Sequence, residues 1–215
     1  MLALVRKKDD CLRERSIINI GGGGSGSNQL NQPYGIEMDK ITNTLYIADY
    51  NNHRIMVYAK NATSGTVGLG GQNAGLNRTQ LYNPVGIYLD YISNSLLIAN
   101  YGANNVVRWI RSEREWILMA GDINGVASNT STTLSCVFDM IFDPMGNMYV
   151  ADRDNRRIQL FMSGEYVGQT IGGITGELGK NASLFRTPRC VKLDNQLNLY
   201  VADSGNHRIQ KFLRY

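Results

Sequence analysis

The stretch Leu199-Tyr200-Val201-Ala202-Asp203-Ser204-Gly205-Asn206-His207-Arg208-Ile209 decides the fold, because similar stretches occur three more times in the chain. They begin at Leu45, Leu97 and Met148, and the copy at Leu97 is the most divergent. The alanine shared by all copies recurs at spacings of 51, 52 and 51 residues, at Ala48, Ala99, Ala151 and Ala202. A fixed period of this size indicates a repeat array, in which each unit buries its apolar face against its neighbours.

Each repeat contains segments with the pattern of short β-strands. The first strand alternates apolar and polar residues, which is the period of a strand. It begins with Pro-x-Gly in the first two repeats and with proline in the fourth, and the third repeat has lost the proline. A polar turn leads to a second strand, the Asp-containing loop leads to a third, and a glycine-rich exit follows a fourth, outer strand. The expected ranges are 33–39, 84–90, 137–143 and 188–194 for the first strand, 44–48, 95–99, 148–151 and 199–202 for the second, 54–59, 106–110, 157–161 and 208–213 for the third, and 66–69, 116–119 and 167–171 for the fourth.

Four-stranded antiparallel units of about 50 residues are what a β-propeller uses for its blades. The core Tyr-Val-Ala-Asp-x-x-Asn-His-Arg-Ile, preceded by Pro-x-Gly-Ile-x-x-Asp, resembles the NHL repeat over roughly residues 17–215. The resemblance implies an all-β fold, a β-propeller of four-stranded antiparallel blades with four repeats in this chain. The repeats are expected at about residues 28–73, 79–125, 132–176 and 183–215.

The two ends of the chain carry further expectations. The propeller is expected over residues 15–215, with residues 15–22 as an outer strand that completes the last blade. Residues 1–14 are interpreted as a basic tail or the remnant of a preceding blade. NHL-type propellers generally have six blades, so we expect a partial or truncated ring that is completed by missing blades or by a partner.

The composition excludes several classes of protein. The net charge is only +4, and acidic residues interrupt the basic N-terminal cluster, which disfavours a nucleic-acid-binding arm. No apolar run approaches the roughly 18 residues of a membrane helix, and the apolar start is too short for a signal peptide. The cysteines Cys11, Cys136 and Cys190 form no Cys-x-x-Cys pair, which excludes a zinc knuckle or thioredoxin-type motif and leaves their disulfide state open.

An aspartate and an arginine recur together inside the repeat, as the pairs Asp49 and Arg54, Asp152 and Arg157, and Asp203 and Arg208. In the second repeat we place Asn100 at the Asp position and Val106 at the Arg position, so both charges are lost together. Joint loss is expected of a buried pair, because one charge left alone would cost about 3–5 kcal/mol. We therefore interpret these pairs as structural rather than catalytic.

The only two histidines, His53 and His207, occupy one motif position, which we align with Asn105 and Arg156 in the other copies. A metal site needs several convergent ligands, and a catalytic base needs a nucleophile or substrate beside it. Two histidines three repeats apart provide neither. We therefore predict no metal site, no cofactor, no catalytic residues and no enzymatic activity.

The loops that enter the first strand and join the second to the third are expected on one face. Tyrosine, asparagine and arginine there form an adaptable recognition surface. The predicted binding residues are Tyr50, Asn51, Asn52, Tyr101, Asn104, Arg153, Asp154, Asn155, Ser204 and Asn206. The first hypothesis is therefore a non-catalytic module that binds a protein or a peptide.

The resemblance implies three alternative functions. One is the substrate-recognition part of a ubiquitin-ligase-type protein. Another is a single-stranded RNA-binding propeller, disfavoured because the face has Arg153 beside Asp154 and no lysine. The third is a metalloenzyme similar to peptidyl-hydroxyglycine lyases, disfavoured because two histidines are too few for that family's metal centre.

Four Asn-x-Ser/Thr sequons give a hint about location. Asn77, Asn129 and Asn181 recur at intervals of 52 residues in loops between blades, and Asn61 lies after a third strand. Exposed loops of secreted proteins are where such asparagines accept glycans. The four asparagines are thus glycosylation candidates and favour an extracellular or ectodomain setting.

Overall fold

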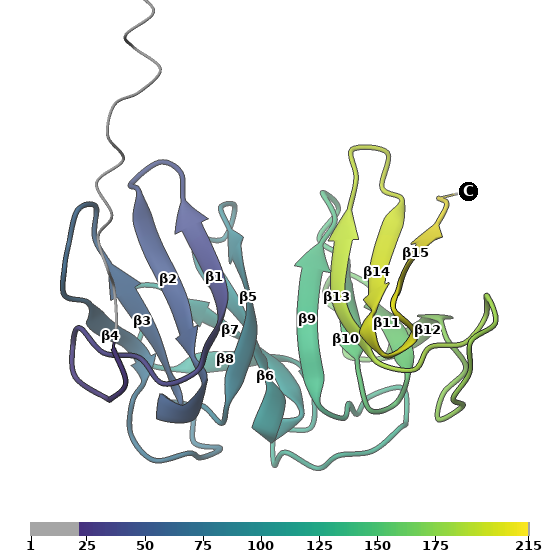
Figure 1. Ribbon diagram of the computed structural model, residues 1–215, viewed down its shortest axis with the longest axis horizontal. Helices are drawn as coiled ribbons and strands as arrows, with labels where there is room; N and C mark the ends of the chain where they lie inside the picture. Colours follow the sequence, from purple (N-terminus) through teal and green to yellow (C-terminus); the bar gives the residue numbers. More distant parts are fainter. Residues whose placement is uncertain (1–21, 215) are drawn as a thin grey trace, which may run out of the picture.

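The computed structural model describes residues 22–214, and within this range consecutive strands form four antiparallel sheets (Figure 1). The first sheet holds β1 (Pro33–Asp39), β2 (Thr44–Asp49), β3 (Arg54–Tyr58) and β4 (Thr66–Gly70). The second holds β5 (Pro84–Asp90), β6 (Ser95–Asn100), β7 (Asn105–Ile110) and β8 (Trp116–Gly121). The third holds β9 (Val137–Phe142), β10 (Met148–Asp152), β11 (Arg157–Phe161) and β12 (Gly168–Gly172), and the fourth holds β13 (Pro188–Leu193), β14 (Leu199–Asp203) and β15 (Arg208–Phe212).

The prediction of an all-β propeller with four repeats is confirmed, because each repeat forms one sheet, or blade, in chain order. The helical elements of the described residues are three-residue 3-10 turns: η2 (Tyr50–Asn52), η3 (Tyr101–Ala103) and η4 (Ser204–Asn206). None of the described residues belongs to a helix long and apolar enough to span a membrane. The predicted outer strand at residues 15–22 and the tail at residues 1–14, with Cys11, lie outside the described residues apart from Gly22.

The alignment of the second repeat was wrong by one residue after its turn. Asp49 pairs with Arg54 in the sheet register, and Asn100 pairs in the same way with Asn105 rather than with Val106. Asn105, not Val106, therefore occupies the Arg position. The left-handed residue that closes each turn is His53, Asn104, Arg156 or His207, so Asn104, not Asn105, is the counterpart of the histidines.

The innermost strands of successive blades pack side by side, β1 against β5, β5 against β9, and β9 against β13. Gly35, in the Pro-x-Gly motif of β1, permits this approach. A Cβ atom at Gly35 would lie 2.3 Å from the carbonyl oxygen of Val85, well inside van der Waals contact. Within the described residues no comparable packing joins β1 to β13, so the four blades form an open arc (Figure 1).

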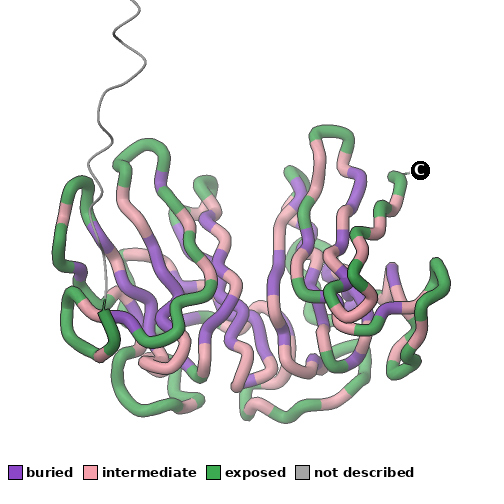
Figure 2. Tube along the Cα trace, in the orientation of Figure 1, coloured by how far each residue is buried: buried purple, intermediate pink, exposed green. Residues whose placement is uncertain are grey.

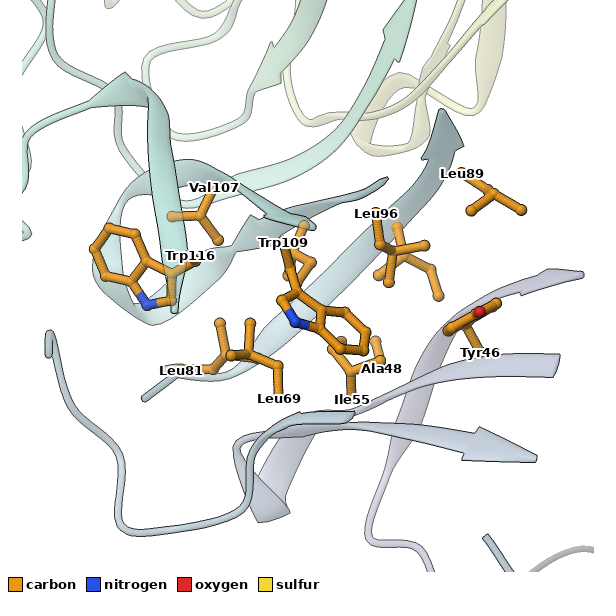
Figure 3. Close-up of a cluster of buried hydrophobic side chains, with 12 residues drawn as sticks. Tyr46, Ala48, Ile55, Leu69, Leu81, Leu89, Leu96, Val107, Trp109 and Trp116 are labelled. Atoms are coloured by element: carbon orange, nitrogen blue, oxygen red, sulfur yellow. The ribbon is translucent and has the colours of Figure 1, made fainter. Parts of the chain in front are cut away.

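The hydrophobic core is divided into clusters, three of which lie between neighbouring blades. Figure 3 shows the first of them, in which Tyr46, Ala48 and Ile55 of the first blade meet Leu96 and Trp109 of the second. Equivalent clusters join the second blade to the third and the third to the fourth. The strands between the loop ends are accordingly the most buried part of the molecule (Figure 2).

The two outer faces of the arc show what a blade exposes without a neighbour. Ile36 of β1 is 67% exposed, whereas its equivalents Ile87, Met140 and Val191 are at most 6% exposed. Ile209 of β15 is 66% exposed, whereas its equivalents Ile55, Val106 and Ile158 are fully buried. The same repeat position is therefore core in the middle of the arc and surface at its ends.

Candidate functional site

The Asp of each motif organises one end of its blade, which we call the motif end. Asp49 Oδ1 accepts a hydrogen bond from Asn31 N at 2.7 Å in the loop that enters the blade, and its Oδ2 accepts from Asn52 Nδ2 at 2.8 Å. Arg54 Nε donates to the same Oδ2 at 2.7 Å. The rest of the Arg54 guanidinium donates to main-chain carbonyls of the entry loop, at Ser25, Gly26 and Gln29. The pair thus fastens the entry loop to the blade.

The same clamp recurs in the third and fourth blades. Asp152 pairs with Arg157 at 2.7 Å and Asp203 pairs with Arg208 at 3.2 Å. The remaining guanidinium hydrogens again bind carbonyls of the entry loop, at Asn129, Thr130 and Thr133 in the third blade and at Lys180, Asn181 and Leu184 in the fourth. These charged groups are therefore bonded to each other and to the main chain of the entry loops.

The second blade has a neutral version of the clamp. Asn100 Oδ1 accepts from Tyr82 N at 2.7 Å, as Asp49 does from Asn31, and Asn105 Nδ2 donates to the carbonyl of Asp122 at 3.2 Å. Asn100 Nδ2 and Asn105 Oδ1 are buried with no partner among the described residues. The asparagine pair keeps the hydrogen bond to the entry loop at Tyr82, but fewer of its polar side-chain atoms have a partner than in the Asp–Arg pairs.

The residue that closes each turn reaches the neighbouring blade. His53 Nδ1 accepts from Asn83 N at 3.2 Å, and Asn104 Oδ1 accepts from Cys136 N at 2.9 Å. Burial lowers the pKa of His53, which keeps its ring neutral and able to accept this bond. Residues 22–214 contain no group of three or more His, Cys, Asp or Glu side chains that could hold a metal ion.

Two of the predicted binding residues, Tyr50 and Tyr101, meet at the motif end near the inner strands. Their ring centroids lie 6.2 Å apart, and Tyr34 of β1 lies 5.0 Å from Tyr50. Phe138 of β9 contacts Tyr34 and Tyr101 edge to face, at 5.9 and 6.1 Å. Rings from three blades therefore form one aromatic cluster.

Two arginines complete this cluster. Arg153 lies over Tyr101 with its Cζ 5.9 Å from the ring centroid, and its Nη1 donates to the Tyr101 hydroxyl at 3.0 Å. Arg189 of β13 lies over Phe138, with its Cζ 5.3 Å from the centroid. Together they enclose a hollow of about 210 Å³, which we call the aromatic pocket, lined by Tyr34, Tyr50, Val85, Tyr101, Phe138, Arg153 and Arg189.

The aromatic pocket is built from two repeat positions. One is the second residue of the inner strand, which all four blades contribute, as Tyr34, Val85, Phe138 and Arg189. The other is the residue after the motif Asp or Asn, which the first three blades contribute, as Tyr50, Tyr101 and Arg153. Sequence reasoning found the second position and missed the first, although the x of Pro-x-Gly marks it in the first two repeats.

A second hollow, of about 540 Å³, adjoins the pocket through Arg153, and we call it the arginine groove. It is lined by Arg153, Asp154, Arg156, Leu178, Arg186 and Thr187. Loop residues of the fourth blade bring Arg186, which the sequence analysis did not place on this face, into the same hollow as Arg153. Asp154, the acid in the groove, is bonded to Arg153 at 3.0 Å.

Of the other predicted binding residues, some line a separate hollow and others form hydrogen bonds within the blades. Asn51 and Asn52 line a separate polar hollow of about 640 Å³ over the first blade. The amides of Asn52, Asn155 and Asn206 each bond the motif Asp and an entry-loop carbonyl, which holds them in the clamp. Ser204 Oγ donates to the carbonyl of Thr187 at 3.1 Å. The structure therefore brings Tyr50, Tyr101, Arg153 and Asp154 together and leaves the rest in other positions.

Burial makes two tyrosines of the aromatic pocket weaker acids. Burial, with the neighbouring Cys136 thiol, raises the pKa of Tyr101 to about 12. Burial also raises the pKa of Tyr50 and of Cys136. The pocket thus offers phenolic hydroxyl groups beside permanent guanidinium charges.

Three four-stranded blades and one three-stranded blade within residues 22–214, with a motif end made of turns, define the chain as a β-propeller. The family model for the NHL repeat matches residues 185–212, the fourth blade. With the propeller arrangement of all four repeats, this supports the chain as an NHL-repeat β-propeller. A search of curated proteins found no match.

Solved structures share the fold at low identity. A protein of unknown function from Bacteroides thetaiotaomicron has a TM-score of 0.68 and 13% identity, covering 84% of this chain and 47% of that one. A chain of a nidogen/laminin complex has a TM-score of 0.63 and 18% identity, covering 86% and 65%. A streptogramin B lyase has a TM-score of 0.60 and 10% identity, covering 91% and 54%. This chain spans about half the length of the first and last of these, and propellers of this shape include enzymes.

Proposed function

We propose that this propeller is a non-catalytic module that binds a protein or a peptide at its motif end. The observation that carries the proposal is the aromatic pocket, in which four rings and two guanidinium groups from neighbouring blades converge on one hollow. Tyrosine and arginine supply much of the binding energy in protein interfaces, because they combine large contact area with hydrogen bonding. A propeller chain in the nidogen/laminin complex is consistent with this class of function.

The absence of catalytic groups is part of the proposal. The motif Asp–Arg pairs are bonded within their clamps, and burial raises the pKa of Tyr50 and Tyr101 in the pocket. A streptogramin B lyase shares the fold at 10% identity, which is a likeness of architecture. The substrate-recognition part of a ubiquitin ligase is one form that such a binding module takes.

Peptide selection tests this proposal. A library of short random peptides displayed on phage is selected against the chain, and the affinity of the winning peptide is measured for Tyr34→Ala and Arg189→Ala. We expect each variant to bind at least about tenfold more weakly, the usual effect of removing a central interface residue. Tyr166→Ala and Arg114→Ala are the matched controls, because these exposed residues lie in the hairpins at the opposite end. Failure to select any peptide, or equal affinity in all four variants, contradicts the proposal.

We also propose an extracellular or ectodomain setting with glycans on exposed loops. Asn61, Asn77, Asn129 and Asn181 are all exposed, as an acceptor asparagine must be. Expression through a eukaryotic secretory pathway, followed by endoglycosidase treatment, is expected to lower the mass of the chain. An unchanged mass contradicts this setting.

The exposed outer faces of the arc support a proposal about its neighbours. Ile36 and Ile209 occupy positions that are core in the other blades, so we propose that further blades or a partner cover them. The 215-residue chain alone is then expected to self-associate as its concentration rises in sedimentation velocity. Ile36→Asp with Ile209→Asp should lower this association, and a wild-type chain that stays monomeric contradicts the proposal.

A further inference from the structure

We infer that the ligand of the motif end is an acidic peptide segment, whose carboxylates bind Arg186 and Arg189 and whose neighbouring apolar side chain enters the aromatic pocket. This inference rests on the proposed function, because it names the partner of the same site. Arg153 lines both hollows, so the arginine groove, over the third and fourth blades, adjoins the aromatic pocket, to which all four blades contribute.

The positive charge of this surface favours an anionic ligand. Four guanidinium groups, from Arg153, Arg156, Arg186 and Arg189, line the two hollows together with one carboxylate, that of Asp154. Asp154 is already bonded to Arg153. The surface therefore carries a net positive charge close to three, which attracts an acidic partner and speeds its association.

Two of these arginines are free to bind. Among the described residues, the side chains of Arg186 and Arg189 make no ion pair and no hydrogen bond, and both residues are exposed. The Nε of Arg153 is buried with no partner in the same range. A guanidinium presents donors in a planar fork that matches a carboxylate in a bidentate manner, which makes an acidic side chain the natural acceptor.

The aromatic rings favour a peptide over a nucleic acid. Single-stranded nucleic acids need ring faces on which bases can stack. Here the rings meet edge to face or tilted, and guanidinium groups cover the faces of Tyr101 and Phe138. The pocket is about 210 Å³, smaller than the 300–1,000 Å³ typical of small-molecule sites. It therefore suits one apolar side chain, held beside the carboxylates by its own backbone.

The pocket also offers polar groups to such a ligand. Tyr34 and Tyr50 line the pocket, and their hydroxyls form no hydrogen bond within residues 22–214. A phenolic O–H can donate a hydrogen bond to a carboxylate or to a peptide carbonyl. Acidic and apolar groups in adjacent positions of a peptide would thus meet complementary groups.

The test compares fluorescein-labelled peptides that alternate Glu with Leu against matched peptides in which every Glu is Gln. Fluorescence anisotropy at low salt is expected to show at least about tenfold tighter binding of the Glu peptide, with affinity falling as salt rises. Arg186→Gln and Arg189→Gln should each remove most of that preference. Arg114→Gln, an exposed arginine of the opposite end, should leave it unchanged. Circular dichroism checks that the variants are folded.

Every outcome of this comparison either supports or contradicts the inference. Equal affinity for the Glu and Gln peptides, or wild-type preference in both arginine variants, overturns the inference. If a selected neutral peptide still binds and loses affinity on Tyr34→Ala, the proposed function is supported and the inference of an acidic ligand is wrong. If no peptide binds, the proposed function and the acidic ligand are both wrong. If a single-stranded RNA oligonucleotide displaces the Glu peptide and binds more tightly, the ligand is a nucleic acid and the inference is wrong.

Discussion

The buried clamp of the motif is a residue-scale device whose energetics can be measured. Asp49 is fully buried, and Arg54 supplies both its counter-charge and the bonds to the entry loop. Arg54→Ala leaves the carboxylate unpaired in the interior, which should lower the free energy of unfolding by about 3–5 kcal/mol. Urea unfolding followed by circular dichroism measures this loss.

The second blade supplies the control for that experiment. The double variant Asp49→Asn with Arg54→Asn copies the Asn100 and Asn105 pair and leaves no buried charge. The double variant should therefore lower the free energy of unfolding by less than Arg54→Ala alone. A double variant that is as unstable as the single one would show that the lost bonds to the entry loop matter more than the unpaired charge.

At the residue scale, a contact could be predicted from the sequence where the same residues recur in several repeats. The Asp–Arg pairs recur with the motif, so their pairing could be predicted before any coordinates. The aromatic pocket could be predicted only in part, because its members differ from blade to blade. Tyr34, Val85, Phe138 and Arg189 share one position and no common chemistry, so only their convergence in space reveals them.

At the scale of elements, an ion pair joins the hairpins of neighbouring blades. Asp39, where β1 ends, lies 2.8 Å from Arg111, which follows β7, and the Arg111 guanidinium lowers the pKa of Asp39 to about 2. Because the folded-state pKa is below the unfolded value near 3.9, the pair stabilises the fold above about pH 4. Its contribution is lost as the pH falls through about 2.

This linkage predicts how one variant depends on pH. Arg111→Gln should be less stable than the wild type between pH 5 and pH 7, and the difference should close as the pH falls from about 4 towards about 2. Urea unfolding at a series of pH values measures it. Arg114→Gln, in the same β7–β8 loop, should show no such change. A difference for Arg111→Gln that is constant down to about pH 2 would rule out this account.

The elements themselves were predictable to within a few residues, because strand alternation and the Pro-x-Gly start are local signals. The second repeat was misaligned after its turn, since its motif is degraded there: Ala103, Asn104 and Asn105 stand where another repeat has Asn52, His53 and Arg54. Only the paired register of β6 and β7 fixed the assignment.

The whole molecule is an arc held by blade-to-blade burial, and equivalent residues test this directly. Ile158 lies in the core between the third and fourth blades, whereas Ile209 occupies the same repeat position on the open face of the fourth. Ile158→Ala should lower the free energy of unfolding by about 2–5 kcal/mol. Ile209→Ala should change it by no more than about 0.5 kcal/mol. Equal losses in urea unfolding would mean that the outer face is already covered.

The central claim is that partners bind where the blades present Tyr34, Tyr50, Tyr101, Arg153 and Arg189 together, and photo-crosslinking tests it most directly. A selected peptide carrying a photoreactive phenylalanine is crosslinked to the folded chain, and the modified residues are located by mass spectrometry. We expect the crosslinks in the inner strands and turns of the motif end, around Tyr34, Tyr101 and Phe138. Crosslinks confined to the hairpins of the opposite end, around Ile92 and Tyr166, would contradict the claim.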